Sequence, residues 1–287
     1  MTTTRKYVGV LLIAACAMPA ALAAQRRAQS GAEKPPPVQA RGTVNLPPLP
    51  PGGPTPRMAD GHPDFSGVWF AGTIGKASAW AADRAAARGG AREEPVPFQP
   101  WASEKIKNMS QTERQILNPA VACTPVGTPG MFTLNHGYPS QIFVAPGIFV
   151  HLTEADNAWR VVHTDGRPHK SADELEPLYN GDETARWDGD TLVIDSISLD
   201  ERTWINGNGW FHSDQAHVIE RIRRPSMNYL EYQYTVEDPK VLTKPWTSLW
   251  DTYTLGKEDL IENFCENNEN IDQLKKLYEQ EQAARKK

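Results

Sequence analysis

The region from residue 141 to residue 264 alternates between apolar and polar positions in short runs, which is the pattern of half-buried β-strands. Turn residues separate these runs at Pro146-Gly147, Asp188-Gly189 and Pro225–Asn228. Asp-Gly is among the strongest short signals for a tight hairpin. The pattern predicts nine strands, over Gln141–Ala145, Ile148–Glu154, Ala158–His163, Thr184–Trp187, Thr191–Ile197, Gln215–Arg223, Tyr229–Glu237, Ser248–Leu255 and Leu260–Phe264.

These runs follow one another at the spacing of hairpins, and no helical pattern lies between them. The predicted fold is therefore mainly all-β: an antiparallel meander that closes into a barrel or half-barrel, with a few peripheral helices. Helices are predicted over Trp101–Leu117 and Asn270–Lys287, and the apolar stripe of the second is expected to dock on the barrel. The segment Ala77–Glu94 is interpreted as a mobile helix or insertion, and Cys123–Tyr138, rich in Gly, Pro and Thr, as irregular.

Strand alternation assigns side chains to faces once the turns are placed. We place Glu154 opposite Ala158 and Arg224 opposite Tyr229. One face of the first hairpin then carries Phe149, His151, Thr153, Trp159, Val161 and His163, and Arg160 lies on the aliphatic face behind it. One face of the second carries His217, Ile219, Arg221, Leu230, Tyr232, Tyr234 and Val236. Aromatic side chains interleaved with a few His and Arg are typical of a pocket wall, so both faces are expected to line a ligand cavity. A turn one residue shorter would change the pairing across the second hairpin but not the alternation within each strand.

The segment from Trp210 to His217 contains the densest group of polar side chains. A histidine beside Asp214 would supply a group that titrates near neutral pH and a carboxylate that orients it, while Tyr232 or Arg221 would stabilise a developing oxyanion. The candidate catalytic residues are His217, Asp214, His212 and Tyr232, and the candidate ligand-binding residues are His151, His163, Arg160, Arg221, Tyr234 and Trp159. The alternative is a loop with surface histidines and one inward histidine bonded to a tyrosine.

His163, Asp165 and His169 could ligate a metal, but their spacing matches no known zinc motif, and Gly166-Arg167-Pro168 between them is typical of a turn. We therefore expect neither a metal nor a cofactor. The sequence contains no Gly-x-Ser-x-Gly elbow, P-loop or dinucleotide fingerprint, so a serine triad has no support.

The first residues have the pattern of a signal peptide, because Arg5 and Lys6 precede an apolar run and Ala21-Leu22-Ala23 offers small residues for cleavage. The predicted organisation is a signal peptide over 1–24, a Pro-rich disordered tether over 25–57, a β-barrel domain over 58–268 and a charged helix over 269–287. Such a protein would be periplasmic or secreted. A rival interpretation treats Ile13–Cys16 as a lipobox, which would make it an outer-membrane lipoprotein.

Export would place Cys123 and Cys265 in an oxidising compartment, where a disulfide between them is the default and two buried thiols are the alternative. The formal net charge of -5 over 287 residues argues against nucleic acid as a partner. With 8 Phe, 8 Tyr and 9 Trp, the chain can build a core, which excludes a wholly disordered protein.

Four motifs resemble a large family of exported bacterial proteins, most of which have no assigned function. They are PDFSGVW at Pro63–Trp69, TDGRPH at Thr164–His169, RWDGDTLVID at Arg186–Asp195 and EDPK at Glu237–Lys240, and the resemblance spans Pro63 to Asn268. It implies a secreted β-rich domain and supplies no reaction. A weaker similarity is to lipocalin-like (calycin) barrels, whose first strand carries Gly-x-Trp, here Gly67-Val68-Trp69. The roughly seventy residues that separate Trp69 from the next predicted strand depart from that family's hairpins.

The sequence thus predicts an exported, lipocalin-like barrel that binds a small aromatic or amphipathic organic molecule in a cavity lined by His, Tyr and Arg. A second hypothesis is a cofactor-independent lyase, isomerase or hydrolase that uses acid–base chemistry centred on His217. A third is an envelope protein whose β surface mediates assembly. The expected partner is a small-molecule ligand or substrate, with membrane attachment only if Cys16 is lipidated.

Overall fold

The computed structural model describes residues 51–71, 94–134, 138–265 and 271–286. The predicted signal peptide, the lipidation site at Cys16 and the tether up to residue 50 lie outside the described residues, as does the predicted insertion over Ala77–Glu94 except for its last residue. The last residues of the predicted tether are hydrogen-bonded to the barrel. The Thr55 hydroxyl donates to the Arg224 carbonyl oxygen, and the Met227 amide donates to the Gly53 carbonyl oxygen.

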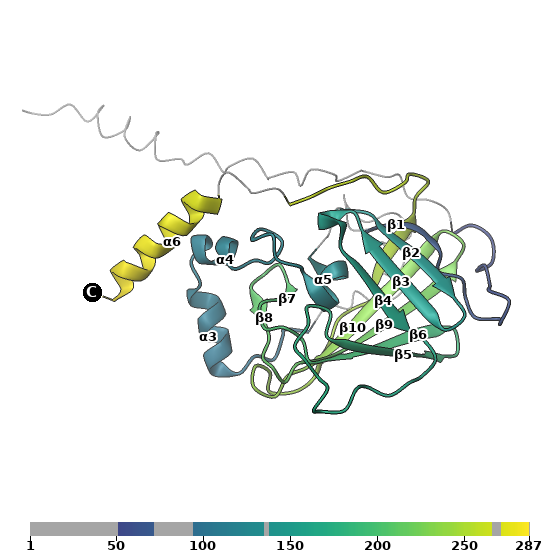
Figure 1. The fold of residues 1–287 in the computed structure, drawn as a ribbon, viewed down its shortest axis with the longest axis horizontal. Helices are drawn as coiled ribbons and strands as arrows, with labels where there is room; N and C mark the ends of the chain where they lie inside the picture. Colours follow the sequence, from purple (N-terminus) through teal and green to yellow (C-terminus); the bar gives the residue numbers. More distant parts are fainter. Residues whose placement is uncertain (1–50, 72–93, 135–137, 266–270, 287) are drawn as a thin grey trace, which may run out of the picture. The chain divides into compact units, whose positions relative to one another are not determined.

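In the described part of the chain, nine strands close into a barrel (Figure 1), which confirms the mainly β fold. The order around the barrel is β10-β12-β1-β2-β3-β4-β5-β6-β9, and β9 pairs back onto β10. The strands are β1 (Gly67–Ala71), β2 (Ser140–Ala145), β3 (Ile148–Thr153), β4 (Trp159–His163), β5 (Asp182–Asp188), β6 (Thr191–Ile197), β9 (His217–Ser226), β10 (Tyr229–Glu237) and β12 (Asp251–Leu255). The short β11 (Trp246–Thr247) also pairs with β10, while β7 (Trp204–Asn206) and β8 (Trp210–Phe211) form a separate ribbon.

Two expectations about the strands were wrong. Leu260–Phe264 forms no strand, and β1 takes the ninth place, between β12 and β2. The chain is also not an antiparallel meander throughout, because β4 and β5 run parallel and pair only at His163 and Thr184. The long connection between these two strands allows the parallel crossing, which a tight hairpin would not.

Four helices within the described residues lie peripheral to the barrel: α3 (Pro100–Asn108), α4 (Gln111–Ile116), α5 (Gly127–Thr133) and α6 (Ile271–Arg285). The single helix predicted over Trp101–Leu117 is therefore two helices, and Ser110 caps the second by accepting a hydrogen bond from the Glu113 amide. Helix α5 lies in a segment predicted to be irregular. All seven of its residues are buried, so packing rather than helix propensity stabilises it.

Helix α6 lies beside α4 (Figure 1), which corrects its predicted docking on the barrel. Ser110 donates a hydrogen bond to Glu281 at 2.6 Å, and Arg285 bonds to Glu113 at 3.1 Å. No residue of α6 is buried, so polar contacts hold this helix more than its apolar stripe does.

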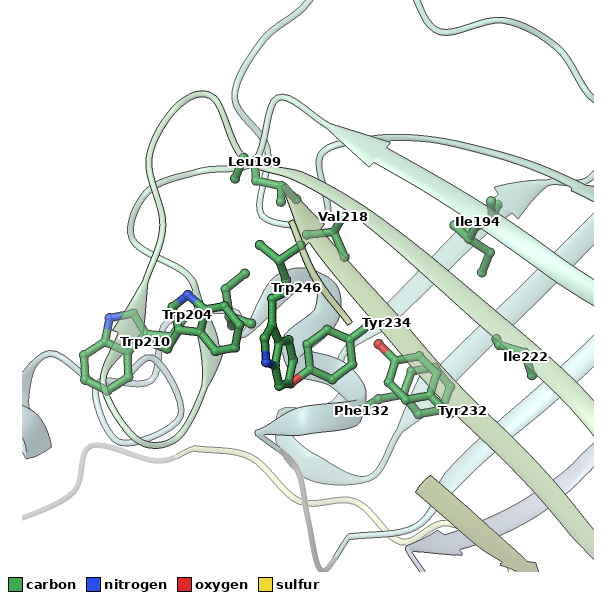
Figure 2. Packing of buried hydrophobic residues seen from close by; sticks show 14 of the residues in the cluster. Phe132, Ile194, Leu199, Trp204, Trp210, Val218, Ile222, Tyr232, Tyr234 and Trp246 are labelled. Atoms are coloured by element: carbon green, nitrogen blue, oxygen red, sulfur yellow. The ribbon is translucent and has the colours of Figure 1, made fainter. Parts of the chain in front are cut away.

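Aromatic side chains form a continuous series of contacts within the core (Figure 2). Tyr234 packs against Trp246 with 5.8 Å between ring centroids, and Trp246 meets Trp210 edge-on at 5.1 Å. Trp69 belongs to β1, the strand that pairs with β12 on the side away from β10. Its side chain is fully buried, and its indole N–H donates to the Phe65 carbonyl oxygen. Trp69 thus has the packing role that the Gly-x-Trp similarity implies.

Cys123 and Cys265 form a disulfide, which confirms the predicted pairing. It joins the segment after α4 to the segment after β12, across 142 residues of sequence. The disulfide is consistent with an extracytoplasmic location.

Candidate functional site

An aromatic ring fills the barrel interior where the sequence predicts a cavity. Phe132 of α5 stacks on His151 of β3 with 4.4 Å between centroids. On its other side it stacks on Tyr232 of β10 with 4.1 Å between centroids, and Figure 2 shows these two rings. The Tyr253 ring of β12 meets its edge at 5.5 Å. At this level, therefore, the interior is packed.

A buried ion cluster lies beside this aromatic stack. Arg160 of β4 is bidentate to Glu220 of β9, with N–O distances of 2.7 and 3.0 Å. The Tyr232 hydroxyl donates to the same carboxylate at 2.8 Å. Arg160 also donates to Glu183 of β5 at 2.9 Å and to the Thr128 hydroxyl of α5 at 2.8 Å. One guanidinium thus ties together four elements of the fold, and a bidentate, multiply bonded pair of this kind holds a fixed geometry.

Glu183 is the member of this cluster with spare bonding capacity. Its Oε1 atom accepts hydrogen bonds from Arg160 and, at 3.0 Å, from the Thr128 hydroxyl, with the Ser196 hydroxyl at 3.4 Å. In the described part of the chain, no hydrogen bond reaches Oε2. Burial raises the pKa of Glu183 to about 7; the charge of Arg160 opposes this rise and that of Glu220 adds to it.

The seam between β4 and β5 opens into a recess of about 780 Å³, because these strands pair at one position only. Glu183, with 6% of its side chain exposed, and Arg160 contribute to the floor. The walls include Trp159, Val161 and His163 of β4, and Arg167, Pro168, Lys170, Leu178, Tyr179 and Asn180 of the connection to β5. We call this space the seam recess.

A second recess, of about 410 Å³, adjoins the seam recess and shares Trp159, Tyr179 and Asn180 with it. Gly127, at the start of α5, lines the second recess and lies against the backbone of Tyr179. A Cβ atom there would lie 2.0 Å from the Tyr179 carbonyl oxygen, and φ is +64°, so only glycine permits this approach. Thr128 then donates its amide to that same oxygen at 3.2 Å, which brings its hydroxyl to Glu183. The disulfide and Phe264 complete the second recess.

On the outer face of the barrel, imidazoles and carboxylates alternate. His169 lies between Asp182 and Asp195 with N–O distances of 2.8 and 2.9 Å. His217 lies between Asp195 and Glu237 at 2.7 and 3.3 Å. We call Asp182, His169, Asp195, His217 and Glu237 the acid–imidazole network. His169 belongs to the connection between β4 and β5 that forms a wall of the seam recess. The network therefore attaches this connection to β5 and β6.

The predicted site residues divide between the two faces of the barrel. His151, Arg160, Tyr232 and Tyr234 are buried on the inner side, whereas Trp159, His163, His217 and Arg221 lie on the outer side. The predicted facing was thus wrong for five of these residues, Arg160 among them. The cause is a one-residue slip in both hairpins: His151 pairs with Arg160, and Tyr232 with Ile222 rather than Arg221. Such a slip exchanges the faces of one strand relative to its neighbour.

The structure does not bring the four candidate catalytic residues together. His217 and Tyr232 point to opposite faces of the sheet. His212 is buried with its Nε2 atom 2.7 Å from the Thr203 hydroxyl, and Asp214 forms an ion pair with Lys240. Of the candidate ligand-binding residues, Trp159, Arg160 and His163 do meet, at the seam recess.

The sequence analysis missed Glu183, Thr128 and Tyr179. Alternation does place Glu183 on one face with the buried Ala185, so extending the predicted strand by one residue would have found it. Nothing local marks Thr128 or Tyr179, because their positions depend on the contact between α5 and the connection before β5.

No protein-family model, curated protein or solved structure matches this chain. The closed barrel is compatible with the lipocalin-like similarity, and the likeness to a family of exported proteins stays a prediction. Among the described residues, none of the helices combines the length and apolar character that crossing a membrane requires. Within the same segments, no three His, Cys, Asp or Glu residues form a group that could hold a metal ion.

Proposed function

We propose that this protein binds a small amphipathic organic molecule with a flat apolar group in the seam recess. The observation that carries the proposal is Trp159, a large aromatic side chain that is 65% exposed on the wall of a recess whose floor is polar. An exposed indole beside a phenol offers apolar faces for stacking, and the buried polar groups would orient the ligand.

The charges around the recess favour a ligand with an acidic or hydrogen-bonding end. Arg167 and Lys170 line its rim, and Arg167 is already paired with Asp165 at 2.6 Å. Lys170 therefore offers positive charge, while Asn180 offers amide hydrogen bonds. The proposed ligand resembles the aromatic or amphipathic molecule expected from the sequence, but it lies at the seam and not in the barrel interior.

The proposal includes an exported protein, periplasmic or secreted, with an outer-membrane lipoprotein anchored at Cys16 as the alternative. The disulfide supports this compartment. Its partner would be a small molecule, and the net charge of -5 argues against nucleic acid. An enzyme centred on His217 has weaker geometric support, because Glu237 and Asp195, rather than Asp214 and Tyr232, surround that imidazole.

Titration of the full-length protein with anilinonaphthalene sulfonate, an amphipathic aromatic anion, tests the proposal. We expect saturable fluorescence enhancement, and Trp159→Ala should weaken binding by about fivefold or more, since an aromatic contact contributes about 1 kcal/mol. Phe143→Ala is the matched control, because Phe143 is an aromatic residue of β2 that is 48% exposed and does not line the recess.

Circular dichroism of both variants shows whether the fold is intact, since this dye also binds partly folded chains. Equal loss in both variants, or binding that does not saturate, would refute the proposal. A protein that binds no dye but purifies with a stable protein partner would instead support the envelope-assembly hypothesis.

A further inference from the structure

The floor of the seam recess holds a carboxylate in the arrangement that proton transfer requires. Three hydrogen-bond donors converge on one oxygen of Glu183, while its other oxygen has no hydrogen bond from the described residues. The first oxygen fixes the orientation of the group, and the second keeps its capacity to accept a proton, on a residue that lines the recess.

We infer that Glu183 is a general base that removes a proton from a planar carbon acid bound in the seam recess. This inference rests on the proposed function, because both use the same recess. Trp159 and Tyr179 would hold the plane of the substrate, and Glu183 Oε2 would face its acidic C–H bond. The reaction needs no cofactor, since the proton passes to the carboxylate and later to water.

The surroundings of Glu183 suit this role. Arg160 and Glu220 form a bidentate pair, so the charge of the guanidinium is largely balanced before Glu183 is considered. The other titratable groups around the recess are His163, Arg167, Lys170, Tyr179 and Asp182. Burial raises the pKa of Glu183 to about 7, so near neutral pH the group both accepts and releases a proton readily.

Nitrobenzisoxazole is a suitable probe, because its ring opens when a base removes one proton. The C–H proton goes to Glu183, and the C–H electron pair becomes part of the nitrile. The N–O bond breaks, and its electron pair stays on the oxygen as a coloured cyano-nitrophenolate. Atoms and charge balance, and the fully conjugated ring matches an aromatic wall.

We expect the full-length protein to open this ring about a hundredfold faster than free acetate at equal concentration, since a positioned base contributes on that scale. The rate should rise with pH to a plateau with a midpoint near 7, because the ionised form is the base. Glu183→Gln, which resembles the protonated carboxyl in shape, should lose the acceleration. Glu176→Gln, an exposed carboxylate on the same connection, is the control and should keep the rate within about twofold.

The dye titration separates the two proposals. Dye binding without ring opening above the acetate rate, or with a rate that Glu183→Gln leaves intact, would overturn the role of Glu183 and leave the binding function standing. Loss of both would refute both. If Glu183→Gln does not fold, the wild-type pH profile decides: a midpoint near 7 supports the inference, and one near 4, the ordinary value for Glu, contradicts it. Added dye should also inhibit ring opening competitively, and a rate insensitive to dye would place the reaction outside the recess.

Discussion

Two histidines of this protein lie in opposite environments. His151 is fully buried beside Phe132, and within the described part of the chain neither of its ring nitrogens has a hydrogen-bond partner. Burial, followed by the charge of Arg160, lowers the pKa of His151 well below the usual value, so it stays neutral. His217 differs, because its hydrogen bond to Asp195 raises its pKa although partial burial opposes the rise. Protonation of His217 in the acid–imidazole network should therefore make the stability of the fold depend on pH.

His217 should stabilise the protein in mildly acidic solution. Its folded-state pKa is raised, so its contribution is complete below the unfolded value of about 6.5 and is lost as pH rises through the folded value. Burial opposes ionisation of Asp195, yet its bonds to His217 and His169 lower its pKa, so it stays charged in this window. We expect His217→Gln to cost on the order of 1 kcal/mol near about pH 5.5 and clearly less near about pH 9, by urea denaturation.

A double-mutant cycle with Asp195→Asn controls this prediction, because removal of the shared carboxylate should abolish most of the pH-dependent difference. A cost of His217→Gln that is equal at both pH values, or larger in alkali, would contradict it.

At the scale of elements, the sequence predicts strands well where a turn signal is local. Asp188-Gly189 connects β5 and β6, and the bounds of β6 and β10 are as predicted. The register in which two strands pair is harder to predict, because it depends on the number of residues in the turn and on bulges in the strands. Ser226 pairs with Tyr229 in a turn two residues shorter than expected, and a bulge between Tyr229 and Glu231 then shifts the pairing by one residue. The net slip of one residue is enough to exchange faces. The parallel pair of β4 and β5 has no local signal at all.

Helix α5 shows why an irregular composition does not exclude a structural role. Its sequence, GTPGMFT, has poor helix propensity, yet it delivers Phe132 into the stack between His151 and Tyr232 and Thr128 to the ion cluster. The contact is tertiary, so a pattern along the chain does not reveal it.

Phe132→Ala should therefore be strongly destabilising. The substitution removes a buried ring from between two aromatic neighbours and leaves a cavity, which costs about 3–5 kcal/mol in the free energy of unfolding. Urea denaturation measures the change, and Phe143→Ala, at an exposed position, should cost less than about 0.5 kcal/mol. A cost below about 1 kcal/mol for Phe132→Ala would show that α5 is not part of the core.

For the molecule as a whole, the fold class could be predicted but the site could not. Alternation and turns are local, and they specify a barrel. The seam recess is lined by β4, β5 and the connection between them, but it exists only because these strands cross in parallel and pair at one position. Its buried carboxylate is in turn held by Thr128 at the start of α5, far away in the sequence. Alternation selected Trp159 and His163 as candidates, and the capacity of a guanidinium to bind a carboxylate selected Arg160. The hydroxyls that orient Glu183, those of Thr128 and Ser196, come from elsewhere in the chain.

The disulfide between Cys123 and Cys265 connects two segments that are far apart in the sequence. Its removal should therefore lower the free energy of unfolding of the entire barrel. Cross-linking residues 142 apart restricts the unfolded chain, which the chain-entropy model values at about 4–5 kcal/mol. The Cys123→Ser, Cys265→Ser double variant should lose that much free energy of unfolding in urea. It should also show a larger dependence on denaturant, because its unfolded chain exposes more surface. A reducing agent should destabilise the wild type to the same extent and leave the double variant unchanged. Equal stability of the double variant and the oxidised wild type would contradict the prediction, and would mean that packing alone holds the wall of the second recess around Phe264.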